Sequence, residues 1–304
     1  MNPKELWSLS LPIGLMLAFV AGVAQAQQQV LRPVQPGLFS TPYSVEAGYV
    51  TDSTLKEGTR EHGDMNTFQS IVRVSSQYQY TENYSMRFGV GLERYGFGLP
   101  SGTPLPNTLA STALLFGNNW RITEKWLAQL ELEPGIYSDF KDISWGDVNV
   151  PTTVRVAYNQ NPRVIWVAAI VVNFRSEFPV FGGVGVQWQI ADEWTLRLIM
   201  PEPRIDYRPI ENLTLSLGAS FAGDSYRVGE NFGASVGRPE LNDEDLTYRE
   251  ARVGIGIRYQ ITKGLAVVGK AGIALDRRFN YSDANLLLRT QDAGYFALSL
   301  LGSF

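Results

Sequence analysis

Apolar and polar residues alternate along most of this chain, in short segments separated by turn-forming residues. Such alternation is typical of β-strands, because successive side chains of a strand point to opposite faces of its sheet. We count fourteen alternating segments, at residues 43–50, 68–80, 84–93, 110–120, 126–136, 153–158, 164–174, 182–190, 194–200, 204–207, 213–221, 249–259, 265–275 and 296–304. The pattern therefore predicts an all-β fold.

The connections between these segments alternate between short and mostly longer. Tight turns are predicted around Glu82, Thr123, Gln160, Asp192, Ile210 and Lys263, and longer loops at residues 51–67, 99–109, 138–150, 223–247 and 276–293. An even strand count, with short turns on one rim and long loops on the other, is the plan of a transmembrane antiparallel up-and-down β-barrel. The connection Pro201–Pro203 is short although it falls on the loop rim, and if it does not separate two strands the count falls from about fourteen to twelve.

The last alternating segment ends on the C-terminal residue itself. Phe296, Leu298, Leu300 and Phe304 share one face of this segment. A strand without a tail to cover its edge needs a pairing partner. We expect it to pair with the first strand and close the barrel, and it resembles the closing strand of bacterial outer-membrane β-barrels.

Alternation alone also fits a soluble sandwich whose core is the apolar face. Tyr and Trp at the strand ends distinguish the two, because these rings prefer the interface between bilayer and water and form girdles at the rims of a membrane barrel. The outward residues at the short-turn ends include Tyr80, Tyr84, Trp120, Trp126, Tyr158, Trp194, Tyr207 and Tyr259, with Phe304 at the end of the chain. We therefore predict a membrane barrel with an interface girdle at these nine positions.

The opposite parity defines the inner face of the predicted barrel. It carries Glu46, Arg73, Arg87, Glu93, Glu131, Glu133, Arg155, Gln187, Arg197, Asp206, Arg208, Glu250, Arg252, Arg258, Gln260 and Lys270. Both signs of charge occur, with a modest basic excess. Two interpretations stay open: salt bridges that fill the barrel, or a water-filled pore whose residual positive charge favours anionic solutes.

The N-terminal segment and the composition indicate the cellular compartment and the class of partner. Residues 1–26 read as a secretory signal peptide, with Lys4, an apolar run and Ala24–Gln25–Ala26 as the cleavage site. Residues 27–40 read as a periplasmic lead-in and residues 41–304 as the barrel. The chain has no cysteine, and its net charge of −4 argues against nucleic acid as a partner.

Candidate catalytic and metal-binding residues are few. His62 is the only histidine; it falls in the predicted loop 51–67, where it is an admissible base for a rim hydrolase, although an exposed histidine without a role is the simpler interpretation. Glu240, Asp243, Glu244 and Asp245 lack the spacing of a calcium loop and read as a solvated loop. We predict no metal, no cofactor and no enzymatic activity.

Residues 179–281 resemble an uncharacterised bacterial family of outer-membrane β-barrel proteins, classed only as a domain of unknown function. The motifs that carry the resemblance are Gly185–Val186–Gln187–Trp188, Asp192–Glu193–Trp194–Thr195–Leu196, Pro201–Glu202–Pro203–Arg204–Ile205–Asp206–Tyr207, Gly223–Asp224–Ser225–Tyr226–Arg227–Val228 and Arg252–Val253–Gly254, with Arg278–Phe279 beyond. The resemblance implies a barrel and no particular activity.

These observations favour a passive channel for small solutes with a mildly basic lumen. The candidate lumen-lining residues are Gln187, Arg197, Arg204, Asp206, Arg208, Glu250, Arg252, Arg258 and Lys270. The competing hypothesis is a plugged structural or adhesive envelope barrel with residues 223–247 as an external recognition loop, and the third is a hydrolase that uses His62. We expect the chain to be inserted into the bacterial outer membrane by the barrel-assembly machinery, in contact with lipid and lipopolysaccharide, with both termini in the periplasm.

Overall fold

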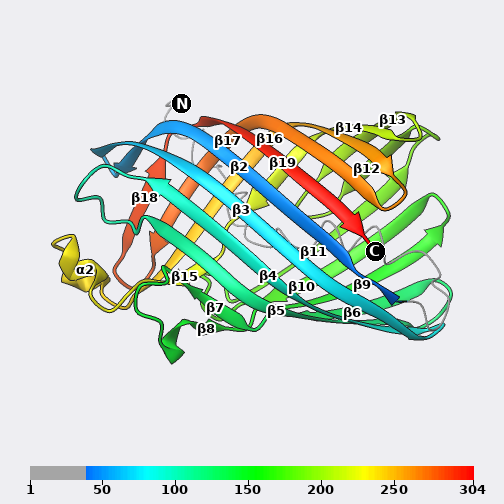
Figure 1. Ribbon diagram of the computed structural model, residues 1–304, viewed down its shortest axis with the longest axis horizontal. Coiled ribbons are helices and arrows are strands. Elements are labelled where there is room, and N and C mark those ends of the chain that lie inside the picture. The colour runs from blue at the N-terminus through cyan, green and yellow to red at the C-terminus, as the bar shows by residue number, and fades with distance from the viewer. Residues whose placement is uncertain (1–38) are drawn as a thin grey trace, which may run out of the picture.

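The alternating segments form the wall of a closed antiparallel β-barrel of fourteen strands in the computed structural model, which describes residues 39–304 (Figure 1). The signal peptide predicted at 1–26 and most of the predicted lead-in lie outside the described residues. The wall strands are β2 (Pro42–Glu57), β3 (Arg60–Thr81), β4 (Tyr84–Gly98), β5 (Thr108–Arg121), β6 (Trp126–Leu132), β9 (Thr152–Asn161), β10 (Val164–Val172), β11 (Val180–Gln189), β12 (Trp194–Leu198), β13 (Arg204–Ile210), β14 (Leu213–Ala222), β16 (Asp245–Thr262), β17 (Leu265–Tyr281) and β19 (Ala293–Ser303).

The C-terminal strand closes the barrel, as the sequence predicts. β19 pairs with β17 on one side and with β2 on the other, from Tyr295 opposite Val50 to Ser303 opposite Pro42. The connection at Pro201–Pro203 does separate two strands, so the count is fourteen rather than twelve. Among residues 39–304, no helix has the length and apolar character needed to cross a bilayer.

Shorter elements decorate the wall, mostly at its loop rim. These are β1 (Phe39–Ser40), β7 (Gly135–Ser138), η3 (Trp145–Asp147), β8 (Val148–Asn149), β15 (Ser225–Arg227), α2 (Phe232–Ser235), η4 (Pro239–Leu241) and β18 (Leu286–Thr290). β7 continues the line of β6 along β5, and β18 fills the space between β17 and β2 above β19.

Two of the predicted long loops are wrong. Residues 51–67 belong to the β2–β3 hairpin, which continues to a tight turn at Gly58, where φ is 58°. Residues 276–293 are largely the upper part of β17 together with β18. The inward residues keep their apolar alternation here, with Leu55 and Met65 fully buried, but the outward residues become polar, and this hides the strand pattern in the sequence.

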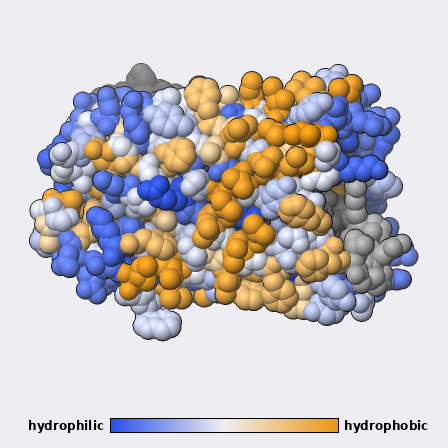
Figure 2. All heavy atoms as spheres, viewed as in Figure 1, coloured by the Kyte–Doolittle hydropathy of each residue, from blue (hydrophilic) through white to orange (hydrophobic). Residues whose placement is uncertain are grey.

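The outer surface of the wall is apolar and the inner surface is polar. In β16, Val253, Ile255 and Ile257 are exposed on the outside, whereas Arg252 is buried inside. Figure 2 shows apolar residues gathered over the middle of the wall and hydrophilic residues towards both ends. This arrangement excludes a sandwich with an apolar core between two sheets, and it is the arrangement expected of a barrel surrounded by lipid.

The predicted girdle residues lie at the short-turn ends of neighbouring strands, where many of their rings touch. Ring centroids lie 5.7 Å apart for Tyr80 and Tyr84 and 5.9 Å apart for Tyr84 and Trp120. The same holds for Trp126 with Tyr158 at 4.7 Å, Trp194 with Tyr207 at 4.6 Å and Phe304 with Tyr43 at 5.0 Å, while Tyr259 is exposed on the outer face of β16. Their position at a membrane interface stays a prediction.

Two glycines allow β16 and β17 to pack closely. Gly254 and Gly272 are direct partners across the two strands. A Cβ atom on Gly254 would lie 2.3 Å from the carbonyl oxygen of Ala271, and one on Gly272 would lie 2.1 Å from the carbonyl oxygen of Val253. The backbones are therefore too close for a side chain at either position, as is common where a barrel wall bends sharply.

Candidate functional site

A cavity of about 960 Å³ occupies the short-turn half of the barrel. It is lined by Lys263, Ser303 and other residues at the short-turn rim, and it reaches Gln69, Arg252 and Tyr295 near the middle of the barrel. The lining side chains come from the polar parity of the wall strands, because a strand that shows lipid an apolar face must turn its polar face inwards.

The cavity lining contains nine basic and six acidic side chains. They are Arg73, Arg87, Arg197, Arg204, Arg208, Arg252, Arg258, Lys263 and Lys270, against Glu46, Glu131, Glu193, Glu202, Asp206 and Glu211. This composition gives the lining an excess of positive charge, although the whole chain is acidic.

Eight of the nine candidate lumen residues lie along this cavity: Gln187, Arg197, Arg204, Asp206, Arg208, Arg252, Arg258 and Lys270. The ninth, Glu250, is not among the lining residues; it is buried and accepts hydrogen bonds from the Tyr248 hydroxyl and Arg252. Contact of any of the nine with a solute stays a prediction.

A cluster of arginines around Asp206 lies on the wall formed by β12 and β13. Arg197 and Arg204 are partners across these strands, so both point inwards, and Asp206 follows Arg204 by two residues on the same face. The Asp206 carboxylate lies 3.0 Å from Arg197 Nε and accepts a 3.0 Å hydrogen bond from Arg204 Nε. Arg204 Nη1 also donates to Glu202 over 3.0 Å.

Further ion pairs link distant strands across the interior. Lys270 Nζ on β17 lies 3.1 Å from Glu202 and 3.7 Å from Glu46, which belongs to β2. Arg73 pairs with Glu133 at 3.1 Å, and Arg87 pairs with Glu131. Because buried charges need partners, these pairs both hold the wall together and restrict the space inside it.

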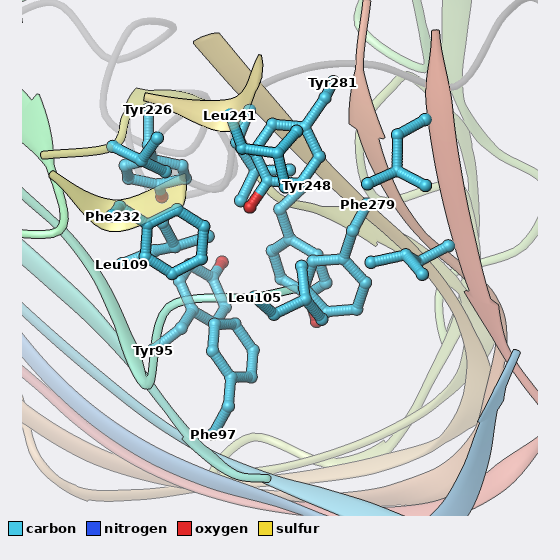
Figure 3. Packing of buried hydrophobic residues seen from close by; sticks show 14 of the residues in the cluster. Tyr95, Phe97, Leu105, Leu109, Tyr226, Phe232, Leu241, Tyr248, Phe279 and Tyr281 are labelled. Atoms are coloured by element: carbon cyan, nitrogen blue, oxygen red, sulfur yellow. The ribbon is translucent and has the colours of Figure 1, made fainter. Parts of the chain in front are cut away.

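The loop half of the barrel is filled by a hydrophobic cluster that we call the aromatic cap. Its members are Leu55, Met65, Tyr95, Phe97, Leu105, Leu109, Ala113, Tyr137, Tyr226, Val228, Phe232, Leu241, Leu246, Tyr248, Phe279, Tyr281, Leu286 and Leu288. Figure 3 shows rings from the wall strands converging on residues of the long loop that contains α2 and η4. Ring centroids lie 4.9 Å apart for Tyr95 and Tyr248, and 5.3 Å apart for Phe97 and Phe279.

The aromatic cap is absent from the sequence-based prediction, because the inward residues that the prediction names are all polar or charged. Part of the cap has a signal in the sequence. Tyr95 and Phe97 follow Glu93 with the same inward parity, and Leu246 and Tyr248 precede Glu250 with the same parity. Extending the alternation beyond the predicted strand ends would have found these four residues.

His62 lies in β3 rather than in a loop, and its side chain is only 6% exposed. The prediction of an exposed loop histidine is therefore wrong. His62 Nε2 lies 3.0 Å from Glu57 Oε2, and the Glu57 carboxylate also accepts hydrogen bonds of 2.8 Å from Arg238 Nη2. Burial alone would raise the pKa of Glu57, but the hydrogen bonds from Arg238 and His62 outweigh it and hold this pKa below its ordinary value. The contact joins the β2–β3 hairpin to the long loop 228–244.

The sequence suggests that the acidic run 240–245 is a solvated loop, but two of its carboxylates form ion pairs with arginines. Asp243 accepts a 2.6 Å hydrogen bond from Arg227 Nε, and this bond holds the pKa of Asp243 below its usual range. Asp245 lies at the start of β16 and pairs with Arg175 at 3.2 Å. The first contact joins the long loop 228–244 to β15, and the second joins the start of β16 to the segment that follows β10.

Comparison with known protein families identifies the chain. Residues 23–299 match the family described as Domain of unknown function (DUF6268). The chain belongs to this family. Membership in DUF6268 confirms the resemblance to an uncharacterised outer-membrane β-barrel family. The sequence motifs that show this resemblance lie within residues 179–281.

Solved structures that resemble this DUF6268 protein include an outer membrane channel and a transporter. The COG4313 outer membrane channel of Pseudomonas putida F1 is 11% identical with a TM-score of 0.48, over 90% of this chain and 98% of that one. The P. putida toluene transporter TodX is 9% identical with a TM-score of 0.43, over 87% and 90% of the two chains. No curated protein matches the sequence. At these identities the likeness concerns the fold and does not extend to cargo.

Proposed function

We propose that this barrel is a passive outer-membrane channel for small solutes, with a mildly basic lumen that is gated at its loop end by the aromatic cap. The cavity of about 960 Å³ in the short-turn half carries this proposal. In the proposed orientation the short-turn rim and both termini face the periplasm, and the long loops face outwards.

The charge of the lining supports a preference for anions. The lining of this confined cavity has nine basic and six acidic side chains, and the outer surface of the surrounding wall is apolar. Charges of one sign that line such a space concentrate small ions of the opposite sign, because the field is less screened there than at an open surface.

A second function, a plugged structural barrel, is favoured by the packing of the cap and by the ion pairs across the interior. The two functions differ in what happens when the cap is loosened. A channel opens a continuous path for ions, whereas a structural barrel stays closed behind its salt bridges.

Shortening the long loop 228–244 tests this difference. The Val228 amide donates a 2.9 Å hydrogen bond to the Glu244 carbonyl, so residues 229–243 can be replaced by an Asn-Gly turn without separating the segments that flank them. This cap-shortened variant lacks Phe232 and Leu241, two buried members of the cap, and also the Arg238 link to Glu57. Trp145→Ser is the matched control, because Trp145 is 91% exposed on a different loop.

The measurement is planar-bilayer conductance of the purified, folded proteins. We expect rare, small openings from the wild type and from Trp145→Ser, and stable conductance steps that favour anions from the cap-shortened variant. A cap-shortened protein that folds but shows no conductance steps would establish the plugged structural barrel instead.

A further inference from the structure

One side of the barrel wall is incomplete in its upper half. β10 pairs with β11 along its whole length, from Val172 opposite Val180 to Val164 opposite Trp188. On its other side β11 pairs with β12 only from Val186 to Gln189. Within residues 39–304, the segment from Val180 to Val184 therefore has no ladder partner on that side.

The gap exists because β12 and β13 are short. β12 has five residues and β13 has seven, whereas a strand that crosses a bilayer needs about nine to eleven. The chain turns back at residues 199–203 and runs beside β14, where the amides of Ala219 and Phe221 donate to the carbonyls of Pro203 and Pro201. We call the gap between the Val180–Val184 edge, this turn and the upper end of β14 the side window.

Exposure agrees with an open edge. Val184 is 85% exposed, and a Cβ atom built on the neighbouring Gly183 would meet nothing within 4 Å. Backbone groups without a hydrogen-bond partner are energetically costly where lipid surrounds a strand. An unpaired edge in the apolar belt of the wall therefore indicates a functional role for the opening.

The inner wall beside the side window is apolar, unlike the charged lining elsewhere. Val167 and Val171 of β10 are buried on the inner face, opposite the exposed Trp166 and Ile170 on the outer face. Ile199, at the lower border of the side window, packs with Val167 and Ala157.

Charged side chains lie directly below this apolar wall. The turn that ends the side window carries Glu202, which is bound by Arg204 and Lys270. The cavity extends along β14 to Phe221 and Ala222, on the opposite border of the side window. Four arginines, Arg197, Arg204, Arg208 and Arg258, gather around Asp206 and outnumber the nearby carboxylates of Asp206 and Glu202. The lumen thus has an excess of positive charge next to an apolar surface that leads to the opening in the wall.

We propose that the side window connects the lumen with the interior of the bilayer and that the channel carries small amphipathic anions. This inference rests on the proposed channel function. The anionic head of such a solute lies near Arg197, Arg204 and Arg208 of the arginine cluster around Asp206, and its apolar tail lies along β10 and passes through the side window. Since the aromatic cap closes the loop end, the side window is a route into the cavity that does not need the cap to open.

The test compares two sulfonates with the same head group in proteoliposomes of phosphatidylcholine and phosphatidylglycerol. Octanesulfonate has an apolar tail and methanesulfonate has none, and neither loses its charge near neutral pH. Gly183→Phe adds an inward side chain beside the side window, where the structure has free space. Gly269→Phe is the matched control: a Cβ there also meets nothing within 4 Å, but its strand partners Ile257 and Leu298 lie on the lipid face of another part of the wall.

We expect wild-type protein to release preloaded octanesulfonate faster than methanesulfonate. Gly183→Phe should slow octanesulfonate release by about tenfold, as expected for an obstruction of modest height, and Gly269→Phe should leave it unchanged. In the cap-shortened background, Gly183→Phe should leave methanesulfonate release unchanged, because that solute then takes the axial path.

Two results would overturn the inference while the channel function stands. One is equal octanesulfonate release by wild type and Gly183→Phe when the cap-shortened protein releases methanesulfonate. The other is that Gly183→Phe in the cap-shortened background stops the release of both sulfonates, which would mean that the new side chain blocks the lumen itself. If no form of the protein, including the cap-shortened variant, releases either sulfonate, the channel function itself is refuted.

Discussion

Asp224 shows how one buried side chain can couple the cap to pH. It follows the end of β14, where its carboxylate accepts hydrogen bonds from the Ser225 amide and from Asn173 Nδ2. Burial raises the pKa of Asp224 to about 8. The folded protein therefore holds a proton at neutral pH that the unfolded chain has lost.

We predict that Asp224→Asn removes a pH dependence of stability. Between the ordinary aspartate pKa, about 3.9, and the folded value, the native state binds more protons than the unfolded state, so wild-type stability falls as pH rises through this interval. The amide keeps a similar shape and cannot ionise. Urea unfolding in detergent at pH 5 and pH 8 measures the effect: the midpoint of wild type should fall relative to that of Asp224→Asn at the higher pH. An unchanged difference between the two proteins at both values would show that Asp224 is ionised in the fold.

Strand pairing between β16 and β17 depends on the close approach of the two backbones at Gly254 and Gly272. Gly254 and Gly272 leave no room for a Cβ atom, whereas a Cβ on Gly256, two residues along the same inner face, would meet Ser216 Cβ at an ordinary 3.6 Å. The two positions have the same residue type, strand and direction, and differ only in available space.

We predict that Gly254→Ala destabilises the barrel by about 1–3 kcal/mol through overpacking. Gly256→Ala, its matched control, should change the free energy of unfolding by less than about 0.5 kcal/mol. The unfolding midpoints of the refolded proteins in detergent provide the comparison. Equal midpoints would mean that β16 and β17 move apart to accept the methyl group at little cost.

The sequence predicts strands well where the two faces differ, and poorly where they do not. β16 is clear, because exposed Val253 and Ile255 alternate with inward Arg252 and Gly254. Above the apolar belt the outer face meets water, the contrast disappears, and the upper part of the β2–β3 hairpin reads as a loop. His62 belongs to this part, which explains its misassignment.

Contacts between distant segments have no local signal at all. Tyr226 and Leu241 fall within residues 223–247, which lack periodicity and are predicted as a loop, yet they belong to the same cluster as wall residues such as Tyr95. The side window is equally hidden, because the short segments at 194–200 and 204–207 reveal nothing about which edge they leave unpaired. Parity finds most of the lumen lining, but the cap and the side window require three-dimensional structure.

At the scale of the whole molecule, charge is distributed unevenly. The chain carries a net charge of −4, while its cavity lining has more basic than acidic side chains. Acidic residues outside the cavity therefore outweigh the basic interior, so the overall charge of the chain does not indicate the charge of the cavity lining.

We predict that Arg208→Gln lowers the preference of the cap-shortened channel for chloride over potassium. Arg208 lines the cavity, so its loss removes one positive charge from the path. The permeability ratio should fall by about twofold to fivefold, the effect of roughly 0.5–1 kcal/mol of electrostatic energy near water. Reversal potentials in a potassium chloride gradient measure this ratio. Arg163→Gln is the control, because Arg163 lies in an exposed turn and pairs with Asp192; an equal shift in both variants would contradict a basic lumen.

In the proposed membrane setting, we expect the unequal height of the wall to affect the surrounding lipid as well. β12 and β13 reach only part of the way that β3 and β16 do. Hydrophobic mismatch of this kind is relieved when the bilayer thins locally or when the protein tilts. Acyl chains beside β12 and β13 should accordingly be shorter in projection and less ordered than those on the opposite side, which gives the barrel a thin flank in the membrane.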